Sequence, residues 1–119
     1  MKNAPKNPQP LSTAAQYILL ALASEDLHGY GIIQEIARHT DGTYRIGPGT
    51  LYDNLKKLMD AQFVIDAPRS NKDRDDDDTR RFYRLTPGGR AALSAEVDRL
   101  RSIVVEAQSR LRERKPRNA

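Results

Sequence analysis

The chain has 119 residues and no cysteine, so disulfides and thiolate metal sites are excluded, and its length favours one domain with a small core. It is basic, with a net charge of +4, and no apolar stretch approaches the roughly 20 residues of a membrane span. The N-terminal residues MKNAPKNPQP lack the apolar segment of a signal peptide, so we expect a cytoplasmic protein with no membrane partner.

The first predicted helix follows residues 1–10, whose prolines and asparagines indicate a flexible arm. Ser12 or Thr13 can cap this helix. Its apolar residues recur at helical spacing and should form one buried stripe, made of Leu11, Ala15, Ile18, Leu19 and Leu22.

A second helix is predicted in GYGIIQEIARHTDG, where a stripe of Tyr30, Ile33, Ile36 and Ala37 has helical spacing before Asp41 and Gly42 end it. Next, the sequence TYRI at residues 43–46 favours a short extended segment.

The third helix is expected at about residues 48–61. Pro48 has the backbone angle that suits the first turn of a helix. The residues that should face the core are Leu51, Leu55, Leu58 and Met59.

Two β-favouring segments, FVIDAPRS and TRRFYRLT, enclose residues 71–78, which include no apolar residue. This pattern predicts a hairpin with a long exposed tip. Its second strand can pack one face against the core and present charge on the other.

The last predicted element is a long helix that Thr86 can cap. At about 1.5 Å per residue it reaches roughly 40 Å, which is longer than a small core needs. We therefore expect it to pair two subunits in a homodimer. The proposed dimer seam follows heptad spacing and consists of Leu93, Val97, Leu100, Val104, Ala107 and Leu111.

The positive charge is concentrated in the second half of the chain. Residues 1–62 carry six basic and six acidic side chains, whereas residues 63–119 carry fourteen and ten. A local basic surplus of this kind suits an anionic partner, and nucleic acid before a membrane surface.

A helix face that could contact DNA lies opposite the predicted core stripe of the third helix. At about 100° per residue, Thr50, Lys56 and Lys57 point away from the core, with Tyr52 and Asn54 at the edges. Such side chains can reach phosphates and base edges in a major groove. Asp53 and Asp60 share this face and would repel phosphate, so an ordinary solvated face remains the alternative.

Three arginines flank the hairpin tip, namely Arg69, Arg80 and Arg81. A guanidinium group suits bidentate contact with phosphate or insertion into a narrow minor groove. The alternative is that these arginines pair with the aspartates of residues 75–78.

Other kinds of site fit less well. The segment GPGTLYDNLKKL lacks the Gly-Lys-Ser/Thr ending of a phosphate loop, His28 and His39 lack zinc-ligand spacing, and residues 75–78 lack the glycine and glutamate of a calcium loop. We expect no catalytic residue, no metal site and no cofactor. The aromatic residues Tyr17, Tyr30, Tyr44 and Phe63 are interpreted as core or groove-lining side chains.

The element order predicts a winged helix-turn-helix, a mainly α (α+β) fold with a long C-terminal dimerisation helix. Residues 11–85 would form the DNA-binding domain, residues 86–115 the dimerisation helix, and residues 116–119 a tail. The segments LHGYGIIQEI, GPGTLYDNLKKLMDAQFVI and RRFYRLTPGGRAAL resemble three blocks of the PadR family of bacterial transcriptional regulators, in the family's order.

The resemblance implies a homodimeric repressor that binds an inverted-repeat operator in double-stranded DNA and is released by a small-molecule effector of unknown identity. It singles out Tyr52 as a DNA-contacting position. A PadR-like module that binds a protein or ligand, and not DNA, is the alternative.

Overall fold

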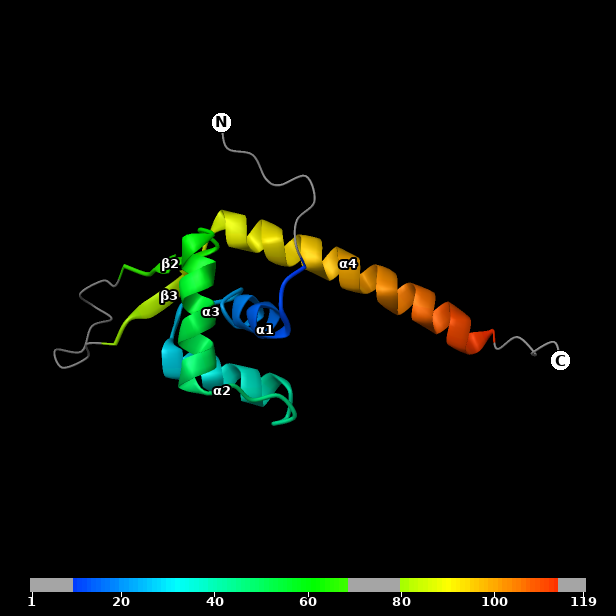
Figure 1. Cartoon of the computed structure of the whole chain (residues 1–119), viewed down its shortest axis with the longest axis horizontal. Helices are drawn as coiled ribbons and strands as arrows, with labels where there is room; N and C mark the ends of the chain where they lie inside the picture. Colours follow the sequence, from blue (N-terminus) through cyan, green and yellow to red (C-terminus); the bar gives the residue numbers. More distant parts are fainter. Residues whose placement is uncertain (1–9, 69–79, 114–119) are drawn as a thin grey trace, which may run out of the picture.

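The computed structural model describes residues 10–68 and 80–113, which form four helices and three strands. Their order is α1 (Thr13–Ala21), β1 (Leu27–His28), α2 (Gly29–His39), α3 (Pro48–Asp60), β2 (Val64–Asp66), β3 (Phe82–Leu85) and α4 (Pro87–Arg112). This order confirms the predicted mainly helical winged helix-turn-helix with a long C-terminal helix. Figure 1 shows α1, α2 and α3 gathered beside the sheet, with α4 extending away from them.

The helices begin at local signals that the sequence carries. The side chains of Ser12 and Thr86 accept hydrogen bonds from backbone N–H groups in the first turns of α1 and α4, as predicted. Pro48 opens α3 at its first position. The cap of α2 is His28, whose Nδ1 accepts from the Gly31 N–H at 3.0 Å.

The core lies between α1, α2, α3 and the sheet. The predicted α1 stripe is confirmed, since Ile18 and Leu19 are fully buried and Leu11 packs against the core. The predicted α2 stripe was partly wrong, because Tyr30 is 64% exposed. The side chains with the least exposure are Ile18, Leu19, Ile32, Ile36, Leu51, Leu55 and Val64.

The buried face of α2 begins at Gly29, which faces α3. A Cβ atom at this position would overlap the hydroxyl of Tyr52, so glycine lets the Tyr52 side chain lie over the start of α2. The buried face of α2 therefore contains Gly29, Ile32 and Ile36, and the next residue after the glycine, Tyr30, turns to the outside.

The sheet is antiparallel, with the order β1-β3-β2. The predicted hairpin is confirmed as β2 and β3, in which Val64 pairs with Leu85 and Asp66 with Tyr83. The third strand is β1, where Leu27 pairs with Tyr83. Residues 43–46, which we expected to be extended, form no strand; instead Tyr44 stacks on Tyr17 with ring centroids 4.9 Å apart.

Only the first part of α4 packs against the domain, through α1 and β3. Leu93 is partly buried against the core and Glu96 is buried, whereas Val97 and the apolar residues after it are exposed in the single chain. Among the described residues, no helix is both long enough and apolar enough to cross a membrane.

Candidate nucleic-acid interface

The exposed face of α3 has the composition predicted from its periodicity. Leu51, Leu55 and Leu58 are buried, while Thr50, Tyr52, Asp53, Lys56, Lys57 and Asp60 are exposed. The first turn of α3 contains no acidic residue, and its N-cap is Gly47, which has no side chain that could cap the helix. The N–H groups at this end can therefore donate to an anion, which the helix dipole also favours.

The two lysines of α3 differ in their surroundings. Lys56 Nζ lies 3.9 Å from a carboxylate oxygen of Asp60, and both side chains are largely exposed, so the pair contributes little. Lys57 makes no ion pair with any residue that the structure describes. It lies beside the groove between α3 and α4, which leaves its charge available to a phosphate.

Asn54 is less exposed to solvent than the other α3 residues proposed for this face. Its side-chain amide donates to the Thr50 carbonyl at 2.8 Å, one turn earlier in the same helix, and the residue is only partly exposed. A base contact by Asn54 would require this hydrogen bond to be exchanged.

Tyr52 connects α3 with the start of α2 and with the hairpin. Its side chain is half exposed, and its hydroxyl lies over Gly29. A shallow depression beside it is also lined by Tyr30 of α2, Tyr83 of β3 and Arg80, which lies just before β3. Sequence reasoning missed Tyr30 as a surface residue, because its spacing also fits the apolar stripe of α2.

Arg81 reaches across the hairpin to β2. Its Nε and one terminal nitrogen donate to Asp66 Oδ1 at 3.0 and 2.6 Å, and its guanidinium lies 5.3 Å from the centre of the Tyr83 ring. The hydrogen bonds to Asp66 raise the pKa of Arg81, although both side chains are 60% exposed. An acidic partner for Arg81 is thus found on the opposite strand, and a phosphate would compete with it.

Arg80 is close to the cap of α2. A terminal nitrogen of Arg80 lies 2.9 Å from His28 Nε2, and the Phe82 ring centre is 5.9 Å from the guanidinium carbon. Arginine can only donate, and His28 Nδ1 already accepts from Gly31. A neutral imidazole has one acceptor nitrogen, so the cap and the Arg80 contact cannot both be full hydrogen bonds at once.

Some predicted features lie outside the described residues, namely Arg69, the aspartates of residues 75–78, and most of the predicted arm and tail. In the described part of the chain, the structure brings Tyr52 of α3, the start of α2, and Arg80 and Arg81 just before β3 to one side of the molecule. It places Lys57 beside the groove that faces α4. No cluster of histidine, aspartate or glutamate suited to a metal occurs in residues 10–68 and 80–113.

Both the sequence and the fold of this chain are similar to those of known proteins. Residues 18–95 match the model of the family described as "Transcriptional regulator PadR-like family". A transcriptional regulator of Mycobacterium tuberculosis is 37% identical over 90 residues, which cover 76% of this chain and 78% of that protein.

Two solved structures share the fold. A PadR family transcription regulator from Clostridium difficile has a TM-score of 0.69 at 23% identity, over 84% of this chain and 99% of that one. Bacillus subtilis PadR, solved in complex with operator DNA, has a TM-score of 0.62 at 23% identity, over 74% of this chain and 48% of that one.

Proposed function

The chain belongs to the PadR-like family of transcriptional regulators, and on that premise we propose that it is a homodimeric repressor that binds an inverted-repeat operator. The protein is thus a regulator and not an enzyme. The observation that carries the proposal is that Tyr52, Arg80 and Arg81 gather on one side of the domain, around the exposed face of α3.

In the proposed complex, α3 enters the major groove with its N-terminal turns foremost, and the β2–β3 hairpin contacts the flanking backbone. Thr50, Tyr52 and Lys57 lie on the exposed side of α3, where they can meet phosphates and base edges. Lys56 lies on the same exposed side, Asn54 contributes at its edge, and Arg69, Arg80 and Arg81 contribute from the hairpin. Access to chromosomal DNA requires a cytoplasmic protein.

Dimerisation is proposed to occur through the exposed apolar side of α4, in line with the domain division at residue 86. The Val97, Leu100 and Val104 side chains are between 37% and 50% exposed in the single chain, which is unusual for apolar residues that follow one helix face. A twofold axis relating two α3 helices gives an operator with half-sites about 34 to 36 Å apart.

A groove between α1, α3 and α4 is the proposed site of a small-molecule effector. This open groove has a volume of about 740 Å³, and its mostly apolar lining includes Leu11, Leu58 and Phe63, with Glu96 and Arg99 also at its wall. This volume lies within the range of about 300 to 1,000 Å³ that is typical of ligand pockets. Because Lys57 borders the groove, an occupant there would alter a side chain that we propose contacts DNA.

The proposal is tested by a gel-shift titration with duplex DNA from upstream of the protein's own gene. Lys57→Ala should weaken binding to all sequences and reduce the dependence of log K on log salt by about one unit, because one phosphate contact is lost. Arg38→Ala is the control, since it also removes one positive charge. Arg38 is in the last turn of α2, away from the α2 residues near Tyr52, and pairs with Glu35.

The opposite results have distinct meanings. An unchanged salt slope for Lys57→Ala would remove that lysine from the interface. No shift at micromolar protein and low salt would favour the second candidate, a protein- or ligand-binding module. The exposed Asp53 and Asp60 on the same face of α3 are the observation that supports that candidate.

A further inference from the structure

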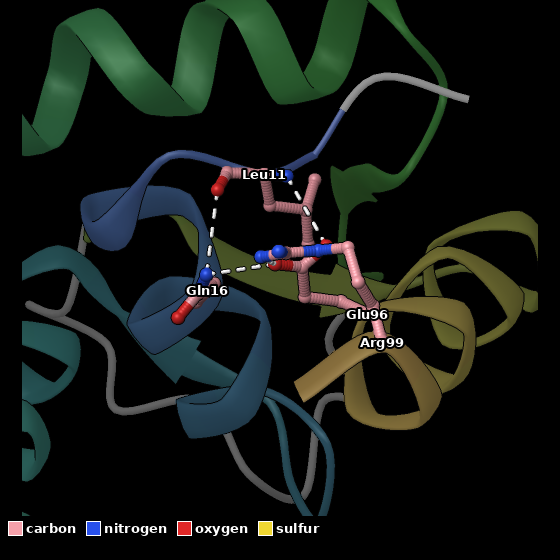
Figure 2. A network of polar contacts seen from close by, with 4 residues as sticks. All are labelled: Leu11, Gln16, Glu96 and Arg99. Atoms are coloured by element: carbon pink, nitrogen blue, oxygen red, sulfur yellow. Dashed lines mark hydrogen bonds and ion pairs between the residues drawn. The ribbon is translucent and has the colours of Figure 1, made fainter. Parts of the chain in front are cut away.

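Glu96 is the buried charged residue of the described chain. It lies on α4 at the point where this helix leaves the domain, and it is only 4% exposed. A buried carboxylate is costly unless hydrogen bonds replace its hydration. Figure 2 shows that the Glu96 carboxylate is surrounded by donors from other parts of the chain.

The donors come from both sides of the junction between α1 and α4. The backbone N–H of Leu11, just before α1, donates to Glu96 Oε1 at 3.3 Å, and the side-chain amide of Gln16 donates to Oε2 at 2.8 Å. Arg99, one turn later on α4, donates to both oxygens. The Gln16 amide also donates to the Leu11 carbonyl at 3.3 Å, which closes the network (Figure 2).

These contacts differ in kind from the apolar packing around them. The hydrophobic attraction between apolar side chains has no preferred direction, whereas hydrogen bonds to a buried carboxylate depend on distance and direction. Hydrogen bonding by Arg99, aided by Leu11 and Gln16, holds the pKa of Glu96 below its ordinary value although burial opposes this shift. The carboxylate is therefore ionised at neutral pH, and its donors cannot be withdrawn without leaving a buried charge unpaired.

The network also lies at a particular place along α4. Before Glu96 the helix packs on the domain, and after it the apolar residues of α4 are exposed. In the proposed homodimer the exposed part of α4 meets the partner, so the direction of α4 relative to α1 determines where each α3 lies. Glu96 is the last buried residue of α4, and it joins α4 directly to α1.

We propose that Glu96 is a positioning residue that sets the separation of the two DNA-reading helices, and thereby the half-site spacing that the protein accepts. The inference rests on the proposed homodimer and DNA-binding function and adds a determinant of specificity to it. A change of one base pair is a displacement of about 3.4 Å, so a small change in the direction of α4 alters the preferred spacing.

The first test measures the separation of the α3 helices without DNA. The chain has no cysteine, so Ala61→Cys, at the exposed end of α3, introduces one spin label per protomer. Pulsed electron resonance then gives the distribution of distances between the two labels of the dimer. Glu96→Gln should broaden this distribution or shift it by about 3 Å or more, the rise of one base pair.

Glu106→Gln is the matched control. Glu106 is on the same helix and also pairs with an arginine one turn later, at 2.8 Å, but its side chain is 62% exposed. Gln16→Ala, which removes the α1 donor and leaves the carboxylate in place, is the second variant if Glu96→Gln does not fold. A label distribution identical to that of the parent protein in the folded variants would overturn the proposal.

The second test is selection of binding sites from random duplex DNA. Glu96→Gln should recover the same half-site sequence as the parent protein, because α3 is unchanged, but with two or more spacings where the parent selects one. One unchanged spacing would overturn the proposal. If the parent protein itself gives no inter-label distance or no inverted repeat, the proposed function fails, and that result is seen before any Glu96 variant is made.

Discussion

Gly29→Ala tests whether Tyr52 contacts DNA without altering Tyr52 itself. A methyl group at position 29 would overlap the Tyr52 hydroxyl and lie 3.0 Å from the Cζ atom of the same ring. The main obstruction is the tip of a side chain that is 50% exposed, so the ring can turn aside while both backbones stay in place. The methyl group would also lie 3.3 Å from Cδ2 of the buried Leu51, which must shift by about a few tenths of an ångström. Gly29→Ala should therefore displace the Tyr52 hydroxyl and leave the fold intact.

The expected change in stability is small because two effects oppose each other. Alanine is more favourable than glycine by about 0.8 to 1 kcal/mol in a helix interior, and Gly29 is the first residue of α2, so the gain there is at most about this size. Moving the Tyr52 side chain away from its preferred rotamer costs about 0.5 to 1.5 kcal/mol. The free energy of unfolding should therefore change by less than about 1 kcal/mol.

The expected change in DNA affinity is larger. A hydrogen bond from the Tyr52 hydroxyl to a phosphate would contribute about 1.5 to 3 kcal/mol, as for other hydrogen bonds to charged groups. Its loss corresponds to roughly ten- to hundredfold weaker binding, since about 1.4 kcal/mol is a factor of ten. Fluorescence anisotropy with a labelled operator duplex at fixed salt measures this difference.

Gly31→Ala is the control, because a Cβ atom there meets only ordinary contacts, the nearest at 3.5 Å on His28. It should bind DNA as the parent protein does. The double variant Gly29→Ala with Tyr52→Phe should bind no more weakly than Tyr52→Phe alone, since both changes act on one hydroxyl. Full affinity of Gly29→Ala, or additive losses in the double variant, would refute this reasoning.

Gly89→Ala should lower the free energy of unfolding, measured in urea melts, by about 2 kcal/mol or more. Its Cβ atom would overlap the backbone carbonyl of Phe63, which cannot move aside as a side chain can. Gly88→Ala is the control, since the nearest contact of its Cβ atom is at 3.6 Å. Val104→Glu should yield a folded monomer in sedimentation, and a stable dimer would remove Val104 from the seam. Because the pKa of Glu96 is lowered from 4.5, its ionised form adds stability above that pH, which is lost as the pH falls through the folded-state pKa. Below about pH 4.5, the melting temperature of Glu96→Gln should therefore fall less steeply with decreasing pH than that of the parent protein. The same pH dependence in both proteins would contradict the role given to the Glu96 carboxylate.

Much of the fold follows from short-range patterns in the sequence. The α3 helix begins at Pro48 as predicted, and its leucines at spacings of four and three residues are buried. Thr86 caps α4, and the two β-favouring segments pair as a hairpin. Each of these features depends on residues close together in the chain, so periodicity, capping and turn signals are sufficient to predict them.

The exposed face of α3 was also predictable, because a known core face defines the opposite one. Thr50, Tyr52 and Lys57 lie outside as expected. Their arrangement with the hairpin was not predictable, since Arg81 meets Asp66 only through the strand register and Arg80 reaches the His28 ring only after β1 joins β3. That strand has two residues, too few for a pattern to be recognised in one dimension.

The sequence by itself determined the four helices, the β2–β3 hairpin, most of the core and the composition of the face proposed to bind DNA, because those features arise from local spacing. Tertiary structure alone decided that Gly29 faces Tyr52, that Tyr30 is exposed and that Glu96 is buried. On a helix of alternating apolar and charged residues, Glu96 has the pattern of a solvated side chain. Its burial depends on Leu11 and Gln16, which are 85 and 80 positions away in the chain, and contacts over that range exist only once the chain has folded.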